Sequence, residues 1–192
     1  MARMQPLPVK DWPLAMGDAL VALNPPASRR SLTGDPSRQG NNILGALAHH
    51  PALAKAFFTL NAHLLRATTL TPRQRELVIM RVAVLRQCSY EWTQHVYLAR
   101  DAELTDSEIA GIAWGPDAPA WNDLDASLLR AVGELDRDGF IADETWAVMV
   151  EHLDARQILD VIFTAGAYTT IAWMVESLGI ELDDDLRDGI TG

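Results

Sequence analysis

One short stretch of the chain brings together three side chains that could do chemistry. The sequence LRQCSYEWTQHVYLAR, residues 85–100, holds Cys88, the single cysteine of the chain, together with Glu91 and His95. Their spacing of three and then four positions places side chains next to one another on one face of a helix. A thiol near a helix start and a histidine can become a nucleophile or an acid, and a histidine–carboxylate pair can move protons near neutral pH.

Purely structural interpretations fit the same spacing. A lone cysteine is most often inert packing, and a histidine on an apolar helix is often a hydrogen-bonded core residue. Three ligands on one helix cannot surround a metal ion, and the sequence shows no second ligand cluster, so we expect no metal site. Spacing alone therefore leaves catalysis and packing both open.

Glu76 is a further candidate, because it lies in the nearly apolar segment LTPRQRELVIMRVAVL. A buried carboxylate in such a helix must be paired or protonated. One interpretation is an ion pair with Arg73 or Arg81. The other is a proton relay to the face that carries Cys88 and His95.

Three helices are predicted to position these residues. Thr71 is a predicted N-cap with Pro72 at the first helical position, and the helix that follows is apolar nearly all round, which is typical of a central, buried helix. A second helix is predicted over 89–101. Thr105 is the predicted N-cap of a third, with Glu108 closing a capping box.

The rest of the chain is also predicted to be helical, and no segment alternates polar and apolar residues with the period of a strand, so the predicted fold class is all-α. Residues 1–42 are proline-rich and are expected to form an irregular arm with one short helix around Pro13–Leu23. Residues 43–192 are expected to form a single domain. Its later helices include one capped near Asp143 and a last one that ends at Gly179.

An internal similarity links two helix starts. LTPRQRELV at residues 70–78 resembles LDARQILDV at residues 153–161. If this reflects a duplication, apolar residues of the second copy occupy the positions of Cys88, Glu91 and His95. The second copy would then be an apolar scaffold.

Composition restricts the partners. The net charge of -10, from 26 acidic and 16 basic residues, argues against nucleic acid. One cysteine cannot form an internal disulfide, which is compatible with a reducing compartment. No apolar run was expected to span a bilayer, and prolines interrupt the N-terminal region where a signal peptide would be apolar. The sequence therefore predicts a soluble cytoplasmic protein with no membrane partner.

The segment from Leu70 to Ile112 resembles the core of the carboxymuconolactone decarboxylase family, whose superfamily includes the AhpD-like alkylhydroperoxidases. The residues that carry the resemblance are Glu76, Cys88, the Tyr-Glu-Trp run at 90–92, His95 and the helix start LTDSEI. The resemblance implies an AhpD-like helical bundle and a cofactor-free lyase that acts on a small lactone or oxygenated carboxylate.

In the family reaction, loss of CO2 leaves a dienolate-like carbanion that must be reprotonated. By this resemblance His95 is the expected acid/base, Glu91 or Glu76 would orient or recharge it, and Cys88 would line the pocket or relay the proton. The expected binding residues are two pocket-wall aromatics and a cation for the substrate carboxylate: Tyr90, Trp92, and Arg81 or an arginine of the 29–38 loop.

Two other functions remain open at this stage. The peroxidase branch has a second cysteine where this chain has Glu91, so a dithiol cycle is disfavoured, but a single-cysteine thiol redox protein is an alternative. A non-catalytic member that keeps the fold is another.

The resemblance implies a trimer or hexamer. Two segments, around 77–85 and 161–175, are almost uniformly apolar, and one small core cannot easily bury both. We therefore predict an obligate homo-oligomer, a trimer first and a dimer as the alternative. Its site should lie near an interface that the helix Pro51–Arg66 helps to close.

Overall fold

Residues 41–183 are described by the computed structural model, and every regular element in this range is a helix, which confirms the all-α prediction. The predicted Pro13–Leu23 helix and the arginines of the 29–38 loop lie outside these residues. The elements in chain order are α2 (Asn41–Leu47), α3 (Pro51–Ala62), the π-helical η2 (His63–Ala67), α4 (Pro72–Leu85), α5 (Ser89–Asp101), α6 (Asp106–Trp114), α7 (Asp123–Asp138), α8 (Asp143–His152) and α9 (Ala155–Leu178). The two asparagines at 41 and 42, predicted as loop, are the first residues of α2.

Local capping interactions start the central helices where the sequence predicted. The Thr71 hydroxyl accepts a hydrogen bond from the Gln74 backbone N–H, and the Gln74 side chain accepts one from the Thr71 N–H. Thr105 and Glu108 form the same reciprocal pair at the start of α6. Each box satisfies backbone donors that the helix cannot pair internally. At α8 the predicted helix starts at Asp143, but the predicted cap is absent: the N-cap residue is Ala142, whose side chain cannot accept a hydrogen bond.

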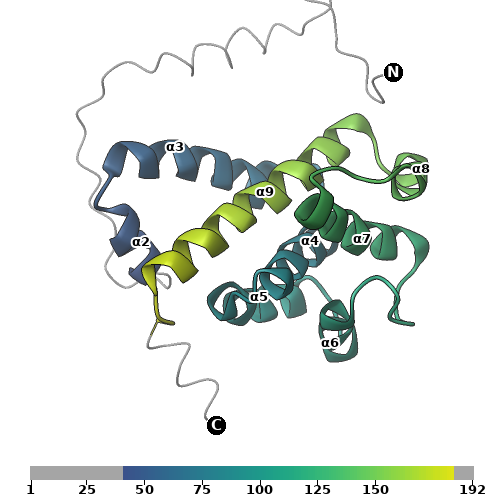
Figure 1. The fold of residues 1–192 in the computed structure, drawn as a ribbon, viewed down its shortest axis with the longest axis horizontal. Coiled ribbons are helices and arrows are strands. Elements are labelled where there is room, and N and C mark those ends of the chain that lie inside the picture. Colours follow the sequence, from purple (N-terminus) through teal and green to yellow (C-terminus); the bar gives the residue numbers. More distant parts are fainter. Residues whose placement is uncertain (1–40, 184–192) are drawn as a thin grey trace, which may run out of the picture. The chain divides into compact units, whose positions relative to one another are not determined.

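α4 is the centre of the fold. It packs against α5, α7 and α9, and Figure 1 shows it behind α9 and beside α7. Seven of its fourteen residues are buried, including Leu77, Ile79 and Met80, as its all-round apolar pattern predicted. The face of α4 that carries Glu76 is therefore shielded from water by neighbouring helices.

α9 is the longest helix and begins with a capping box made by Asp154 and Gln157. It ends at Gly179, whose φ of 61° is left-handed, as the C-cap prediction required. By length and composition α9 could cross a membrane, which corrects the expectation that no such run exists. However, 56% of its most apolar window is buried inside the fold, as in the core helix of a soluble protein.

The similarity between the starts of α4 and α9 extends to their capping boxes, because both helices have glutamine at the third position after the N-cap. The two helices also pack against each other. Beyond their starts they differ. α4 ends at Leu85 and the chain turns before α5, whereas α9 runs unbroken to Leu178, through the positions that correspond to the turn and to α5 as far as His95.

Candidate functional site

A tight turn between α4 and α5 positions Cys88. Arg86 is the C-cap residue of α4, Gln87 has a left-handed φ of 54°, and Cys88 is the N-cap residue of α5. A non-glycine residue with positive φ is uncommon and marks a turn with little freedom. Cys88, Glu91 and His95 then lie along one face of α5, as their spacing predicted, and this face is buried.

Glu76 and His95 form a buried hydrogen-bonded pair across the α4–α5 contact. His95 Nδ1 is 2.7 Å from Glu76 Oε2, and the Glu76 side chain has no exposed surface. The other carboxylate oxygen, Oε1, accepts a 2.9 Å hydrogen bond from Arg75 Nε, and Arg75 Nη2 forms an ion-pair contact with it, also at 2.9 Å. The carboxylate charge is thus compensated, which a buried carboxylate requires.

Arg75 is itself held by the segment before α4. Its Nη1 donates a 2.8 Å hydrogen bond to the Leu65 carbonyl, which lies in η2. π-helical turns leave carbonyl groups without their usual intrahelical donors and occur often at functional sites. The α3–η2 segment therefore fixes Arg75, Arg75 fixes Glu76, and Glu76 fixes the His95 ring.

Tyr168 of α9 covers the other side of the histidine. Its ring meets the His95 ring edge-to-face, with centroids 5.1 Å apart and planes at 84°. Burial raises the pKa of Tyr168, and the nearby charges of Glu76 and Glu91 act in the same direction. The phenol is therefore a neutral hydroxyl near the carboxyl groups of Glu76 and Glu91.

Cys88 and Glu91 form the second part of the cluster. Burial raises the pKa of the Cys88 thiol to about 12, and the charges of Glu91 and Glu176 add to this rise. Burial also raises the pKa of Glu91 to about 8, the Glu176 charge adds to it, and the neighbouring thiol opposes it. No N–H or O–H group in the described part of the chain donates to the Glu91 carboxyl oxygens. At neutral pH both groups therefore carry their protons.

The remaining predicted site residues lie apart from this cluster. Arg81 donates a 2.9 Å hydrogen bond from Nη1 to the Ile112 carbonyl, near the end of α6, and lines a hollow of about 290 Å³ between that region and α7. The Tyr90 hydroxyl donates to Asp183 Oδ2 at 2.5 Å. Trp92 is half-buried and packs against the core.

Glu76 does not pair with either arginine that the sequence suggested. Arg73 turns toward α6 and α7, where it binds Glu108 at 2.6 Å and Asp125 at 2.9 Å. The partner is Arg75, which sequence reasoning missed because adjacent helical residues do not normally face each other. Tyr168 was also missed, and no spacing rule links it to the residues of α5.

Within residues 41–183, no group of three or more histidine, cysteine, aspartate or glutamate side chains is arranged to hold a metal ion. The His95 side chain is 9% exposed, and the hollow lined by Arg81 includes no residue of the Glu76–His95 or Cys88–Glu91 pairs. The cluster is thus a group of polar side chains enclosed between α4, α5 and α9.

Comparison with known proteins points to one family. Residues 51–134 match the model of the carboxymuconolactone decarboxylase family. This range includes Glu76, Cys88, Glu91 and His95, and it ends within α7. No curated protein matches the chain in sequence.

Solved structures share the fold at low identity. One is a protein of unknown function from Agrobacterium tumefaciens, a candidate antioxidant defence protein AhpD, with TM-score 0.65, 18% identity, and coverage of 71% of this chain and 94% of that one. A peroxidase-related protein from Ralstonia eutropha, described as an alkylhydroperoxidase AhpD core, has TM-score 0.66, 19% identity, and coverage of 76% and 78%. A peroxidase-related protein from Silicibacter sp. has TM-score 0.67, 15% identity, and coverage of 75% and 77%. The AhpD-like fold predicted from the sequence is confirmed.

Proposed function

We propose that this chain, which belongs to the carboxymuconolactone decarboxylase family, is a cofactor-free acid–base enzyme. Its substrate class is a small lactone or oxygenated carboxylate, and its reaction is a decarboxylation or a related proton transfer. The observation that carries the proposal is the buried 2.7 Å contact between His95 Nδ1 and Glu76 Oε2. Pairs of this kind are built to hold and move a proton.

The hydrogen bond supports a definite protonation pattern. Since the Glu76 carboxylate accepts, His95 donates from Nδ1–H, and Nε2 of the neutral ring remains a proton acceptor. When Nε2 takes a proton, the imidazolium is stabilised by the carboxylate below it. Arg75 is a positioning residue, because it acts on the histidine only through Glu76.

The chemistry of decarboxylation fits these groups. The bond between the carboxylate carbon of the substrate and its lactone ring breaks, and CO2 leaves. The electron pair of that bond is delocalised into the lactone carbonyl, which gives a dienolate. The imidazolium of His95 then donates its Nε2 proton to the carbanionic carbon, and solvent restores that proton. Glu91, neutral because its pKa is about 8, is a second proton source on the same helix face.

Access to His95 requires a local opening. The Leu65 carbonyl holds Arg75 over the pair, so we place the opening at the α3–η2 segment, or at an interface that this segment completes. This agrees with the expectation that the helix Pro51–Arg66 helps to close the site. Arg81 binds away from the pair, so we do not assign it to the substrate carboxylate.

A thiol-dependent peroxidase is the second candidate, and it is favoured by the descriptions of the structural neighbours as peroxidase-related. The state of Cys88 opposes it. With a pKa of about 12, about one thiol in 100,000 is ionised at neutral pH, and the thiolate is the nucleophile.

The test compares wild type with His95→Gln on a panel of carboxylated lactones and phenolic acids, read by CO2 release. His95→Gln should lower turnover by about 100- to 10,000-fold, the usual contribution of a general acid or base. His152→Gln, at an exposed histidine near the end of α8, is the matched control and should leave turnover unchanged.

Wild-type turnover by the His95→Gln protein would remove His95 from the mechanism. Peroxide consumption that is abolished by Cys88→Ser, without CO2 release, would establish the redox candidate. If the wild type shows neither activity, the chain is a non-catalytic member of the family.

We further propose that the chain works in the cytoplasm and does not bind nucleic acid. A single buried thiol is compatible with a reducing environment, and the net charge is -10. Fractionation of cells that produce the protein tests the location.

A further inference from the structure

The hollow between the end of α6 and α7 gathers positive charge in a chain that is acidic as a whole. Its charged lining consists of three arginines and one glutamate: Arg81, Arg130, Arg137 and Glu134. These side chains leave two positive charges in excess, whereas the formal charge of the whole chain is -10. A cleft lined mainly by one sign of charge concentrates small ions of the opposite sign.

Glu134, the carboxylate in this lining, is engaged elsewhere. Its Oε2 accepts a 2.8 Å hydrogen bond from the Ala142 backbone N–H, and its Oε1 accepts one of 2.7 Å from the Thr145 hydroxyl. Both donors belong to the start of α8. The Glu134 charge acts through space on Arg137, which lies at the exposed rim of the hollow. Glu134 therefore joins α7 to α8 and leaves Arg81 without a carboxylate partner.

Arg81 is the least exposed of the three arginines, and within residues 41–183 its guanidinium forms no ion pair. Its Nη1 donates to the Ile112 carbonyl, and its Nε is buried without a hydrogen-bond partner. Burial lowers the pKa of Arg81, because the guanidinium has lost water and no described carboxylate compensates this loss. Charged groups removed from water are normally paired. An anion in the hollow would supply the missing partner.

The Arg81 guanidinium is held in place by its surroundings. A Cβ added at Gly115 would lie 2.9 Å from Arg81 Nη2, so a glycine at this position is what lets the two approach so closely. The Gly115 φ of 96° also favours glycine. On the α7 side, a Cβ added at Gly133 would meet nothing within 4 Å. A fixed cation beside open space is preorganised for binding, which lowers the cost of ordering it.

The two outer arginines can add to the site. Arg130 is 3.6 Å from Asp117, and Arg137 pairs with Asp138. The arginine side chains are 44% and 68% exposed, and exposed ion pairs of this kind contribute little to stability. A ligand with two negative charges in the hollow can therefore draw both guanidinium groups toward it.

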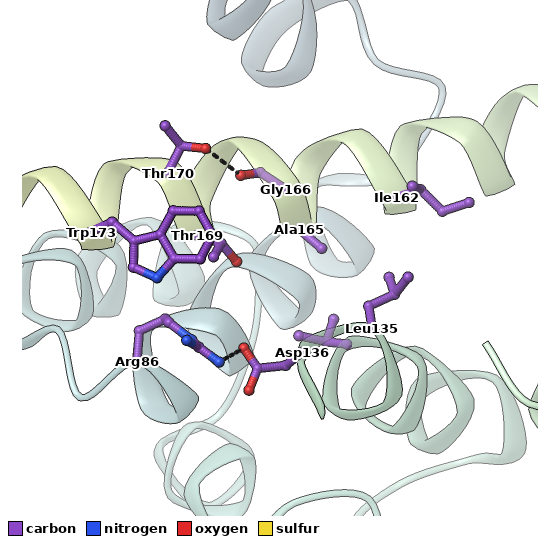
Figure 2. A pocket seen from close by; sticks show the side chains of 10 residues that line it. Arg86, Leu135, Asp136, Ile162, Ala165, Gly166, Thr169, Thr170 and Trp173 are labelled. Carbon is purple, nitrogen blue, oxygen red and sulfur yellow. Dashed lines mark hydrogen bonds and ion pairs between the residues drawn. The ribbon is translucent and has the colours of Figure 1, made fainter. Parts of the chain in front are cut away.

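A larger groove beside α9 lacks this excess of charge. Figure 2 shows this groove, of about 470 Å³, with Ile162 toward one end and Trp173 toward the other. Its arginine, Arg86, binds Asp136, which also lines the groove. The charges there are balanced, so Arg86 is a suitable comparison for Arg81.

We propose that Arg81, together with Arg130 and Arg137, forms a binding site for a phosphate group, either free phosphate or the phosphate of a small ester. The planar donors of arginine match the oxygen atoms of phosphate. A phosphate dianion balances the two positive charges in excess, whereas a simple carboxylate balances one. The hollow includes no residue of the Glu76–His95 pair, so this inference does not depend on the proposed enzyme activity.

The test is calorimetric titration of the full-length chain with sodium phosphate at about pH 8, where phosphate is a dianion, and at constant ionic strength. Arg81→Gln should raise the dissociation constant about 10- to 100-fold, the value of one charge-assisted hydrogen bond. Arg86→Gln removes the same charge from an arginine that Asp136 already pairs, and it should leave the dissociation constant unchanged. Titration with glycerol phosphate distinguishes the sources: tighter binding than that of inorganic phosphate assigns the site to an ester, and weaker binding assigns it to free phosphate.

A second variant does not disturb the bond between Arg81 and the Ile112 carbonyl. Gly133→Glu puts a carboxylate at the hollow, where its Cβ has free space, and should abolish phosphate binding. Gly166→Glu on α9 has the same free space and the same change of charge, and it should bind phosphate as the wild type does.

Three results would overturn the proposal. The first is a wild type that does not bind phosphate below about 10 mM. The second is an equal affinity for phosphate of Arg81→Gln and wild type, or of Gly133→Glu and Gly166→Glu. The third is binding of acetate as tightly as phosphate, since acetate carries a single charge.

Discussion

Glu91→Gln should change the pH dependence of stability in a way that only a buried neutral carboxyl predicts. Burial raises the pKa of Glu91 from 4.5 to about 8. Since each tenfold change in the acid dissociation constant is worth about 1.4 kcal/mol, the folded state favours the protonated form by about 5 kcal/mol.

The sign follows from which state holds the proton. Below pH 4.5 Glu91 is protonated in both the folded and the unfolded chain, and its full contribution to the free energy of unfolding is present. As the pH rises from 4.5 toward 8, the unfolded chain releases the proton while the folded chain still holds it, so this contribution is progressively lost. Glutamine cannot ionise, so its effect on the free energy of unfolding does not depend on pH. The difference in unfolding free energy between Glu91→Gln and wild type should therefore shift in favour of the variant by about 4 kcal/mol between about pH 5 and about pH 9.

Urea unfolding at one fixed protein concentration measures this difference, because association also stabilises the folded state. Comparing two pH values removes any constant cost of the buried amide. Glu151→Gln, at an exposed position of α8, is the matched control. A pH-dependent change of less than about 1 kcal/mol for Glu91→Gln would refute the reasoning.

Two further predictions follow from the same cluster. Arg75→Gln should destabilise the protein by about 3–5 kcal/mol, because it leaves a fully buried carboxylate without its cation; Arg100→Gln, which breaks the exposed pair with Asp106, should cost less than about 1 kcal/mol in the same unfolding assay. Cys88 is 1% exposed with a pKa of about 12, so Ellman's reagent should label the native thiol at least about 1,000-fold more slowly than the unfolded one. Equal costs for the two arginine variants, or rapid native labelling, would contradict the geometry of the cluster.

The helices that carry the site were predictable because their signals are local. Thr71, Pro72 and Gln74 start α4 through bonds within one turn, and the same holds for Thr105 and Glu108. The helix predicted near Asp143 starts there, but it starts without the predicted side-chain cap. Nothing in the sequence signalled that α3 widens into the π-helical η2.

The common helix face of Cys88, Glu91 and His95 also followed from sequence, because helical periodicity alone places residues three and four apart together. The sequence left the burial of this face open, and the packing of α5 against α4 decided it. Whether these groups pair, and with what, did not follow from periodicity.

Tertiary packing decided the chemistry of the site. Long charged side chains have many rotamers, so the choice of Arg75 over Arg73 as the partner of Glu76 depends on the Leu65 carbonyl and on the competing acids of α6 and α7. Tyr168 reaches His95 because α9 crosses α4, a contact between residues 73 positions apart in the chain. The sequence by itself determined which side chains share a helix face, since that depends on interactions within a turn or two; only the packing of α4, α5 and α9 decided which of them are buried, paired and protonated.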